Sequence, residues 1–171
     1  HHFASLYRSG LCEYKDGKFV ELYNVDNSPL NSIVPDLASQ KYKTVSCSAL
    51  SYDADGNLWM AQSMLDTTFY VRKPDGNWFK LRYNEMSGSS LIDKILHHSS
   101  GIKLVSSRRL DKRGVFCIDM KGTERTTDDK TRLPQDFVNQ ANTPYLPAQL
   151  FCLCEDLDRM VWVGTSAGLF V

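Results

Sequence analysis

The chain has 171 residues, of which 42% are hydrophobic, so it can bury a core of ordinary size. Its 20 basic and 20 acidic side chains cancel, so no overall field would gather a nucleic acid or an anionic membrane. The apolar runs are far shorter than the roughly 20 residues that a membrane-spanning helix needs. Together these properties disfavour nucleic acid as a partner and predict no transmembrane segment in this portion.

The first predicted element is a β-hairpin over 10–22. Its turn contains Asp16 and Gly17, and an Asp-Gly pair between β-rich runs is the strongest short-range hairpin signal. Residues 3–23 are therefore predicted to hold the last strands of a sheet unit, and 24–44 to form a long loop.

Residues 45–83 are predicted to form one complete unit of antiparallel strands. In 48–63 an apolar strand, a polar turn at 53–57 and a second strand follow one another. A second hairpin covers 68–81, with its Asp-Gly turn at 74–77. Both turns are expected at the same end of the sheet, and no helix is expected inside 45–63.

The next unit is predicted over 91–127. Residues 91–98 have a weak helical pattern, but their place in the repeat predicts a strand before the turn at Gly101. A second strand pair is expected within 114–124.

The rest of the chain is predicted to be a long loop followed by an incomplete unit. Residues 125–148 are expected as loop, because three prolines fall within 133–148 and leave room for one short helical turn at most. Strands are expected again over 149–171, ending with a third strand at 168–171.

These units repeat: the turn glycines Gly56 and Gly101 are 45 residues apart, and Arg159 takes the same place 58 residues later. The strand after each turn begins with a large apolar residue: Trp59, Leu104 and Trp162. A unit of four strands cannot bury both faces alone and must stack on its neighbours. The predicted fold class is therefore all-β, with four-stranded antiparallel β-propeller blades.

The segment CEDLDRMVWVGTSAGLFV resembles the two-component regulator propeller repeat, in which an Asp-rich turn precedes Trp-x-Gly-Thr and Gly-Leu. Two other stretches, SYDADGNLWM with KPDGNWFKL and HHSSGIKLVSSRR with GVFCIDMKGTERTTDD, are more similar to the propeller part of a type IX secretion system component. The resemblance implies a periplasmic or cell-surface location in a Gram-negative bacterium. For the secretion component, it also implies a role in delivering anionic lipopolysaccharide to secreted cargo.

Both ends of the chain carry what is predicted to be the third strand of a blade, at 10–14 and 168–171. Two such ends cannot complete one blade, and a closed propeller needs roughly four to eight blades. The chain is therefore expected to be part of a larger propeller, whose remaining blades are its first partners.

Candidate binding residues lie in the long loops, which connect the strands at one end of the blades. Four cations in one loop could bind phosphate or carboxylate groups of an anionic glycan or lipopolysaccharide, although a solvated loop is the simpler interpretation. Two further candidates lie in the loops 24–44 and 63–67. The site candidates are Arg108, Arg109, Lys112, Arg113, Asp66 and Tyr42, and Lys41, Lys43 and Tyr145 are expected on the same face.

Neither a catalytic group nor a cofactor or metal site is predicted. His1 and His2 stand where the end of a purification tag would stand, and His97 and His98 point to opposite faces of a strand. Asp53 to Asn57 lacks the spacing of a calcium loop and is predicted to be a hairpin turn. Five cysteines in apolar runs are expected to be buried free thiols, and the tryptophans are expected to pack between blades.

The sequence therefore predicts a non-catalytic extracytoplasmic module that binds a glycan or secretion-system proteins, or assembles with them. The alternative is the periplasmic propeller of a two-component signalling protein that responds to oligosaccharides. A third interpretation, a hydrolase or lyase, would need an acid/base pair from the remaining blades.

Overall fold

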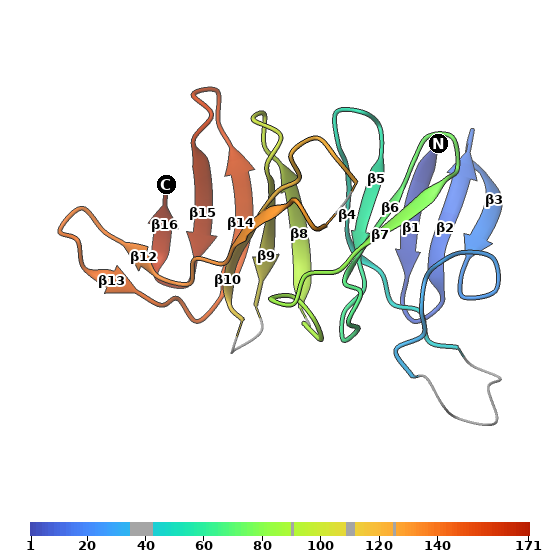
Figure 1. The fold of residues 1–171 in the computed structure, drawn as a ribbon, viewed down its shortest axis with the longest axis horizontal. Helices are drawn as coiled ribbons and strands as arrows, with labels where there is room; N and C mark the ends of the chain where they lie inside the picture. The colour runs from blue at the N-terminus through green and yellow to red at the C-terminus, as the bar shows by residue number, and fades with distance from the viewer. Residues whose placement is uncertain (35–42, 90, 109–111, 125) are drawn as a thin grey trace. The chain divides into compact units, whose positions relative to one another are not determined.

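All the named strands pair antiparallel in the computed structural model, which describes residues 1–34, 43–89, 91–108, 112–124 and 126–171 (Figure 1). The described residues contain strands and turns and no helix, which confirms the all-β prediction. No membrane-spanning helix is therefore found among them. The chain divides into two compact units, His1–Gly88 and Ser89–Val171.

The first unit holds two antiparallel sheets, each with its strands in sequence order (Figure 1). The sheet of three strands consists of β1 (His2–Leu6), β2 (Gly10–Lys15) and β3 (Lys18–Tyr23). The sheet of four strands consists of β4 (Ser48–Tyr52), β5 (Leu58–Ala61), β6 (Phe69–Arg72) and β7 (Trp78–Leu81). The predicted four-stranded sheet within 45–83 is confirmed, whereas β1 is a strand that the hairpin pattern at 10–22 did not predict.

The turn between β4 and β5 is organised by the carboxylate of Asp53. One of its oxygens accepts hydrogen bonds from the backbone N–H groups of Asp55 (3.1 Å) and Asn57 (2.9 Å). The other accepts from the Asn57 amide (3.0 Å) and from the indole Nε1 of Trp59 (2.8 Å). Asp53 therefore closes a hairpin turn, as predicted.

The two sheets of the first unit share one hydrophobic core. Its buried members come from both sheets and from the segment that joins them: Leu11, Leu30, Val45, Cys47, Leu58, Met60 and Tyr70. Because one face of each sheet is apolar, stacking the sheets removes both faces from water, which is the main favourable contribution to folding.

The second unit contains two larger sheets and a small hairpin. The sheet of four strands consists of β8 (Ile92–His97), β9 (Lys103–Ser107), β10 (Gly114–Asp119) and β11 (Lys130–Arg132). The hairpin consists of β12 (Phe137–Val138) and β13 (Pro144–Tyr145). The sheet of three strands consists of β14 (Leu150–Glu155), β15 (Val161–Thr165) and β16 (Gly168–Phe170).

Two predictions for this unit are wrong. The strand that completes the β8–β11 sheet is β11, so this sheet extends past the predicted end of the blade at 127. The segment 133–148 is not a simple loop and has no helical turn, because β12 and β13 pair within it. Phe137 of this hairpin and Phe170 of β16 have ring centroids 5.2 Å apart, so an aromatic contact holds the hairpin against the last sheet.

The cysteines are free, as expected, but they are not all buried. Cys12 and Cys47 are buried, Cys117 is half-buried, and Cys152 and Cys154 are exposed. The β14–β15 register shifts between residues 150 and 152. This irregularity turns Leu150 and Leu153 into the core of the second unit and leaves Cys152 and Cys154 outside it.

Candidate functional site

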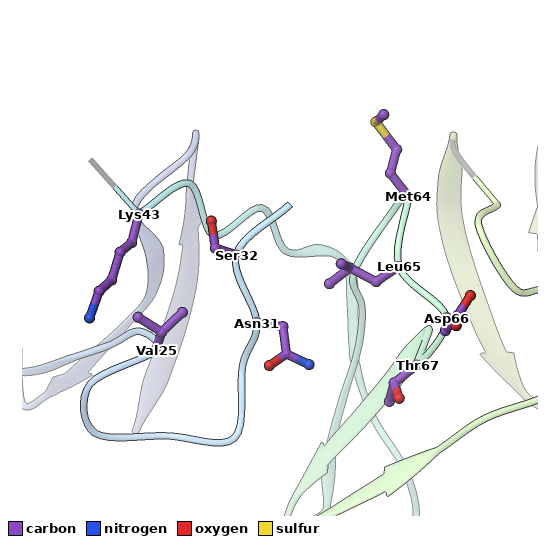
Figure 2. A pocket seen from close by; sticks show the side chains of 8 residues that line it. All are labelled: Val25, Asn31, Ser32, Lys43, Met64, Leu65, Asp66 and Thr67. Atoms are coloured by element: carbon purple, nitrogen blue, oxygen red, sulfur yellow. The ribbon is translucent and has the colours of Figure 1, made fainter. Parts of the chain in front are cut away.

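An open pocket of about 580 Å³ lies in the first unit between two of the long loops (Figure 2). One loop joins β3 to β4 and the other joins β5 to β6. Figure 2 shows the side chains of the two loops on opposite sides of this pocket. They are Val25, Asn31, Ser32 and Lys43 from the first loop, and Met64, Leu65, Asp66 and Thr67 from the second.

Asn31 is held in place by the fully buried Gln62, the first residue after β5. The Gln62 side-chain oxygen accepts from the Asn31 backbone N–H at 2.9 Å, and its amide nitrogen donates to the Asn31 carbonyl at 3.0 Å. The side-chain amide of Gln62 thus pairs with both backbone polar groups of Asn31, as the backbone of a neighbouring strand would. This double contact ties the first loop to the end of β5.

The Asn31 side chain is fixed as well. Its Nδ2 donates to the hydroxyl of Tyr70 at 2.9 Å, and Tyr70 is fully buried. Burial raises the pKa of Tyr70 to about 12, so the hydroxyl stays neutral at physiological pH. Asn31 therefore presents its amide at the pocket with little conformational freedom left to lose on binding.

Ser32 closes the base of the first loop. Its hydroxyl accepts from the backbone N–H of Val34 at 3.2 Å and of Thr44 at 3.1 Å. The backbone N–H of Ile33 donates to the Thr44 carbonyl at 2.9 Å. These bonds position Lys43 at the pocket wall, where it forms an ion pair with Asp26.

Asp66 lies on the opposite wall, and it and Lys43 of the first loop are the residues of the predicted binding face that line this pocket. Ser87 donates to its Oδ1 at 2.6 Å, and Arg82 lies 3.5 Å from its Oδ2. The pocket thus carries one carboxylate and one ammonium group, and each already has a partner of opposite charge. It suits a ligand that is neutral overall and forms hydrogen bonds.

The predicted cations lie in the second unit. Arg108 forms an ion pair with Asp93 of β8, and Nη1 of Arg113 donates to the Ala148 carbonyl at 3.2 Å. Lys112 is half-buried, whereas Arg109, Lys41 and Tyr42 lie outside the described residues. The described arginines are therefore held by groups of their own unit, which an anion would have to displace or share.

The sequence reasoning missed Asn31, Gln62 and Thr67. Their loops were identified, but the cation pattern directed the search for a site to another loop. One signal was present, because Gln62 follows an entirely apolar strand and a glutamine at such a position needs partners inside the protein. Among the described residues, no group of three or more His, Cys, Asp or Glu side chains could hold a metal ion.

Two solved structures are similar to the chain. PorZ, an essential bacterial surface component of the type IX secretion system of Porphyromonas gingivalis, matches 98% of this chain with a TM-score of 0.86 and 22% identity. The extracellular domain of the hybrid two-component system BT3049 from B. thetaiotaomicron matches 95% with a TM-score of 0.56 and 16% identity.

The matched region is 22% of the PorZ chain and 19% of the BT3049 chain, so this chain spans about a fifth of either protein. No family model and no curated protein sequence matches it. The secretion-system component that the repeat segments resemble is PorZ. The resemblance inferred from the repeat is therefore confirmed at the level of the fold, which this chain shares with PorZ and, more distantly, with the extracellular domain of a hybrid two-component system.

Proposed function

We propose that this chain is part of an extracytoplasmic β-propeller that acts as a non-catalytic binding or assembly module, as a PorZ-like component of type IX secretion. The observation that carries the proposal is the TM-score of 0.86 over 98% of the chain, against 0.56 for the extracellular domain of BT3049. PorZ is a bacterial surface component, which supports a location in the periplasm or at the cell surface.

The non-catalytic part of the proposal rests on the chemistry of the pocket. General acid–base catalysis needs a proton donor or acceptor that can reach the substrate and has a suitable pKa. Asp66 is the pocket carboxylate, and it is engaged by Ser87 and Arg82. Neutral amide and hydroxyl groups such as Asn31 and Thr67 are suited to recognition.

The loop with Arg108, Arg109, Lys112 and Arg113 remains our proposed contact for an anionic glycan, lipopolysaccharide or secretion-system protein. An arginine has five N–H donors, and the contact between Arg113 and Ala148 uses a donor on Nη1. The ion pair between Arg108 and Asp93 is one-third to one-half exposed, so an anion can compete for this guanidinium at modest cost.

Binding is tested in the full-length protein with lipopolysaccharide from the same organism. Arg108→Ala with Arg109→Ala should weaken binding, and added salt should weaken it in the parent protein, because exposed charge pairs are screened. Lys130→Ala with Arg132→Ala removes the same charge from β11 and should leave binding unchanged. Equal loss in both double variants would refute the loop as the contact.

The cellular role is tested by deleting the gene and measuring cargo at the cell surface. Loss of secreted cargo, restored by the intact gene, supports the PorZ-like role. The BT3049 similarity favours a sensor as second candidate. In that case secretion persists in the deletion strain while its transcriptional response to an oligosaccharide disappears.

A further inference from the structure

The open pocket between the β3–β4 and β5–β6 loops has an exposed apolar side that the β5–β6 loop holds in place (Figure 2). Met64 is 64% exposed and has a φ of 67°, in the left-handed region that a residue with a side chain rarely adopts. The carbonyl of Leu65 accepts from the backbone N–H of Gly88 at 2.9 Å. The Thr68 hydroxyl donates to the Met86 carbonyl, also at 2.9 Å. The loop is therefore anchored while Met64 stays strained and exposed, and such strain clusters at ligand sites.

The pocket also has two hydrogen-bonding groups that the fold does not use. Oδ1 of Asn31 can only accept, and no described residue donates to it. The Thr67 hydroxyl can donate and accept, and it has no hydrogen-bond partner within the described part of the chain. The Asn31 acceptor is prearranged, because Gln62 holds its backbone and Tyr70 holds its amide nitrogen.

The charged groups of the pocket, by contrast, already have partners. Asp66 accepts from Ser87 and lies beside Arg82. Lys43 forms an ion pair with Asp26. The pocket therefore has no surplus charge for an ion to neutralise, and a neutral ligand is favoured.

Three features remain for such a ligand: the acceptor on Asn31, the hydroxyl of Thr67 and an apolar wall. The apolar wall consists of Val25, Met64 and Leu65. An acetamido group matches all three features, because its N–H needs an acceptor, its carbonyl needs a donor and its methyl needs an apolar surface. A purely apolar chain would leave both polar groups of the pocket without partners, which costs free energy.

The composition of the pocket also bears on the kind of sugar that fits. None of its eight described lining residues is aromatic, so the ring of a plain sugar has no aromatic face to pack on. The volume of about 580 Å³ equals that of roughly 20 water molecules, so a sugar ring fits beside an acetamido group. A sugar would therefore be recognised through its acetamido substituent.

We propose that this pocket binds a neutral N-acetylated sugar through its acetamido group. The sugar N–H bonds to Oδ1 of Asn31, its carbonyl accepts from the Thr67 hydroxyl, and its methyl packs against the apolar wall. This ligand class rests on the proposed function of the chain as a binding module. A peptide amide carries the same two polar groups, but its chain continues on both sides, whereas an acetamido methyl ends at one wall.

The probes are N-acetylglucosamine and glucose, titrated by calorimetry into the full-length protein. Glucose has a hydroxyl in place of the acetamido group and should bind about tenfold more weakly. Thr67→Val keeps the shape of the side chain without its hydroxyl and should weaken N-acetylglucosamine binding about tenfold, whereas Thr67→Ser should bind as the parent does. Thr143→Val is the matched control, because it changes an exposed threonine of the second unit and should leave binding unchanged.

Binding that requires the acetamido group and falls in Thr67→Val, but not in Thr67→Ser or Thr143→Val, supports the site. Equal affinity for the two sugars, parent-like affinity in Thr67→Val or no binding to the parent overturns it. N-acetylalanine methylamide is the third probe. If it binds more tightly than N-acetylglucosamine and loses affinity in Thr67→Val, the ligand is a peptide and the sugar proposal is overturned.

Failure of this site and failure of the proposed function give different results. Changes at Thr67 leave the cations at 108–113 intact, so lipopolysaccharide binding that still depends on those cations keeps the proposed function while the acetamido site fails. Secretion that persists in the deletion strain, together with normal N-acetylglucosamine binding, refutes the PorZ-like role and keeps the site.

Discussion

The indole Nε1 of Trp162 donates a hydrogen bond of 2.6 Å to the carboxylate of Asp156, which lies six positions earlier in the chain. The first unit contains the same pair, with Trp59 donating to Asp53 at 2.8 Å. In both cases the aspartate also accepts from backbone N–H groups of its turn. The pair thus connects the turn of a hairpin to its second strand.

The middle copy of the repeat changes both members of this pair. Leu104 stands at the tryptophan position and has no N–H to donate. His98 stands at the aspartate position, and its Nδ1 accepts from the backbone N–H of Ser100 at 3.1 Å. In this copy, a ring nitrogen of His98 takes the place of the carboxylate oxygen as acceptor for the turn N–H, and the indole donor is absent. The two departures from the repeat therefore affect the two members of one hydrogen-bonded pair.

The first prediction concerns the charge of Asp156. The hydrogen bond from Trp162 is the largest cause that holds the pKa of Asp156 below its ordinary value of 3.8. Trp162→Phe should therefore raise this pKa, as measured by NMR titration of the carboxyl carbon. Trp78→Phe, which removes a tryptophan of the first unit that is not among the causes of this shift, should leave the pKa unchanged.

The same shift sets a pH window for stability. Because the folded-state pKa is lowered, the ionised Asp156 stabilises the fold above about pH 3.8, and this contribution is lost as pH falls through the folded-state pKa. Trp162→Phe should therefore lower the urea midpoint at pH 7 more than near pH 3. An equal loss at both pH values would contradict this mechanism.

Gln62→Ala should lower the free energy of unfolding by about 1–3 kcal/mol, because it leaves the Asn31 backbone groups without their buried partners. Urea unfolding measures this loss. The matched control is Gln149→Ala, an exposed glutamine whose removal should cost no more than about 0.5 kcal/mol. A loss for Gln62→Ala as small as for the control would show that the amide contact does not hold the pocket.

Gly114 begins β10 with a φ of 152°, and a Cβ at this position would lie 2.3 Å from the backbone oxygen of Pro134. Gly114→Ala should therefore destabilise the fold by more than about 1 kcal/mol, since the backbone must move. Gly76 also has a positive φ, but a Cβ there would meet no atom within 4 Å. Gly76→Ala should cost less in the same denaturation experiment, and the reverse order would contradict the packing described for Gly114.

The last sheet carries a concentration of exposed apolar side chains, which predicts that residues 1–171 self-associate. The exposed residues are Phe151, Trp162 and Leu169 in its strands, Leu157 and Met160 between β14 and β15, and Val171 after β16. Phe151→Ser with Leu169→Ser should reduce association in sedimentation experiments. Met64→Ser, which changes an equally exposed apolar residue of the first unit, should not reduce association. A monomeric parent chain would refute the prediction.

The sequence predicted the hairpins well, because Asp-Gly turns and strand alternation are local signals. It placed the fourth strand of the 91–127 unit too early. The strand is β11, which pairs over only three residues, with Cys117, Ile118 and Asp119. Such a short polar strand has little pattern of its own, and tertiary contacts determine where it pairs.

The candidate site was harder to predict for the same physical reason. Its key contact joins Asn31 and Gln62 across 31 positions, and no turn or periodicity indicates that these two amides meet. The cations at 108–113 formed a conspicuous local pattern. Their engagement by Asp93 and by the Ala148 carbonyl depends on the fold and cannot be read from spacing.

The irregular register at the start of β14 has a consequence for thiol reactivity. Because Leu150 and Leu153 both enter the core, Cys152 and Cys154 remain open to an alkylating reagent. Burial raises the pKa of Cys47 to about 12 and also raises that of Cys117, so these thiols form little of the reactive thiolate. Fast labelling of both Cys152 and Cys154 would thus indicate the β14–β15 register described here. A slip of that register by one residue would shield both thiols from the reagent.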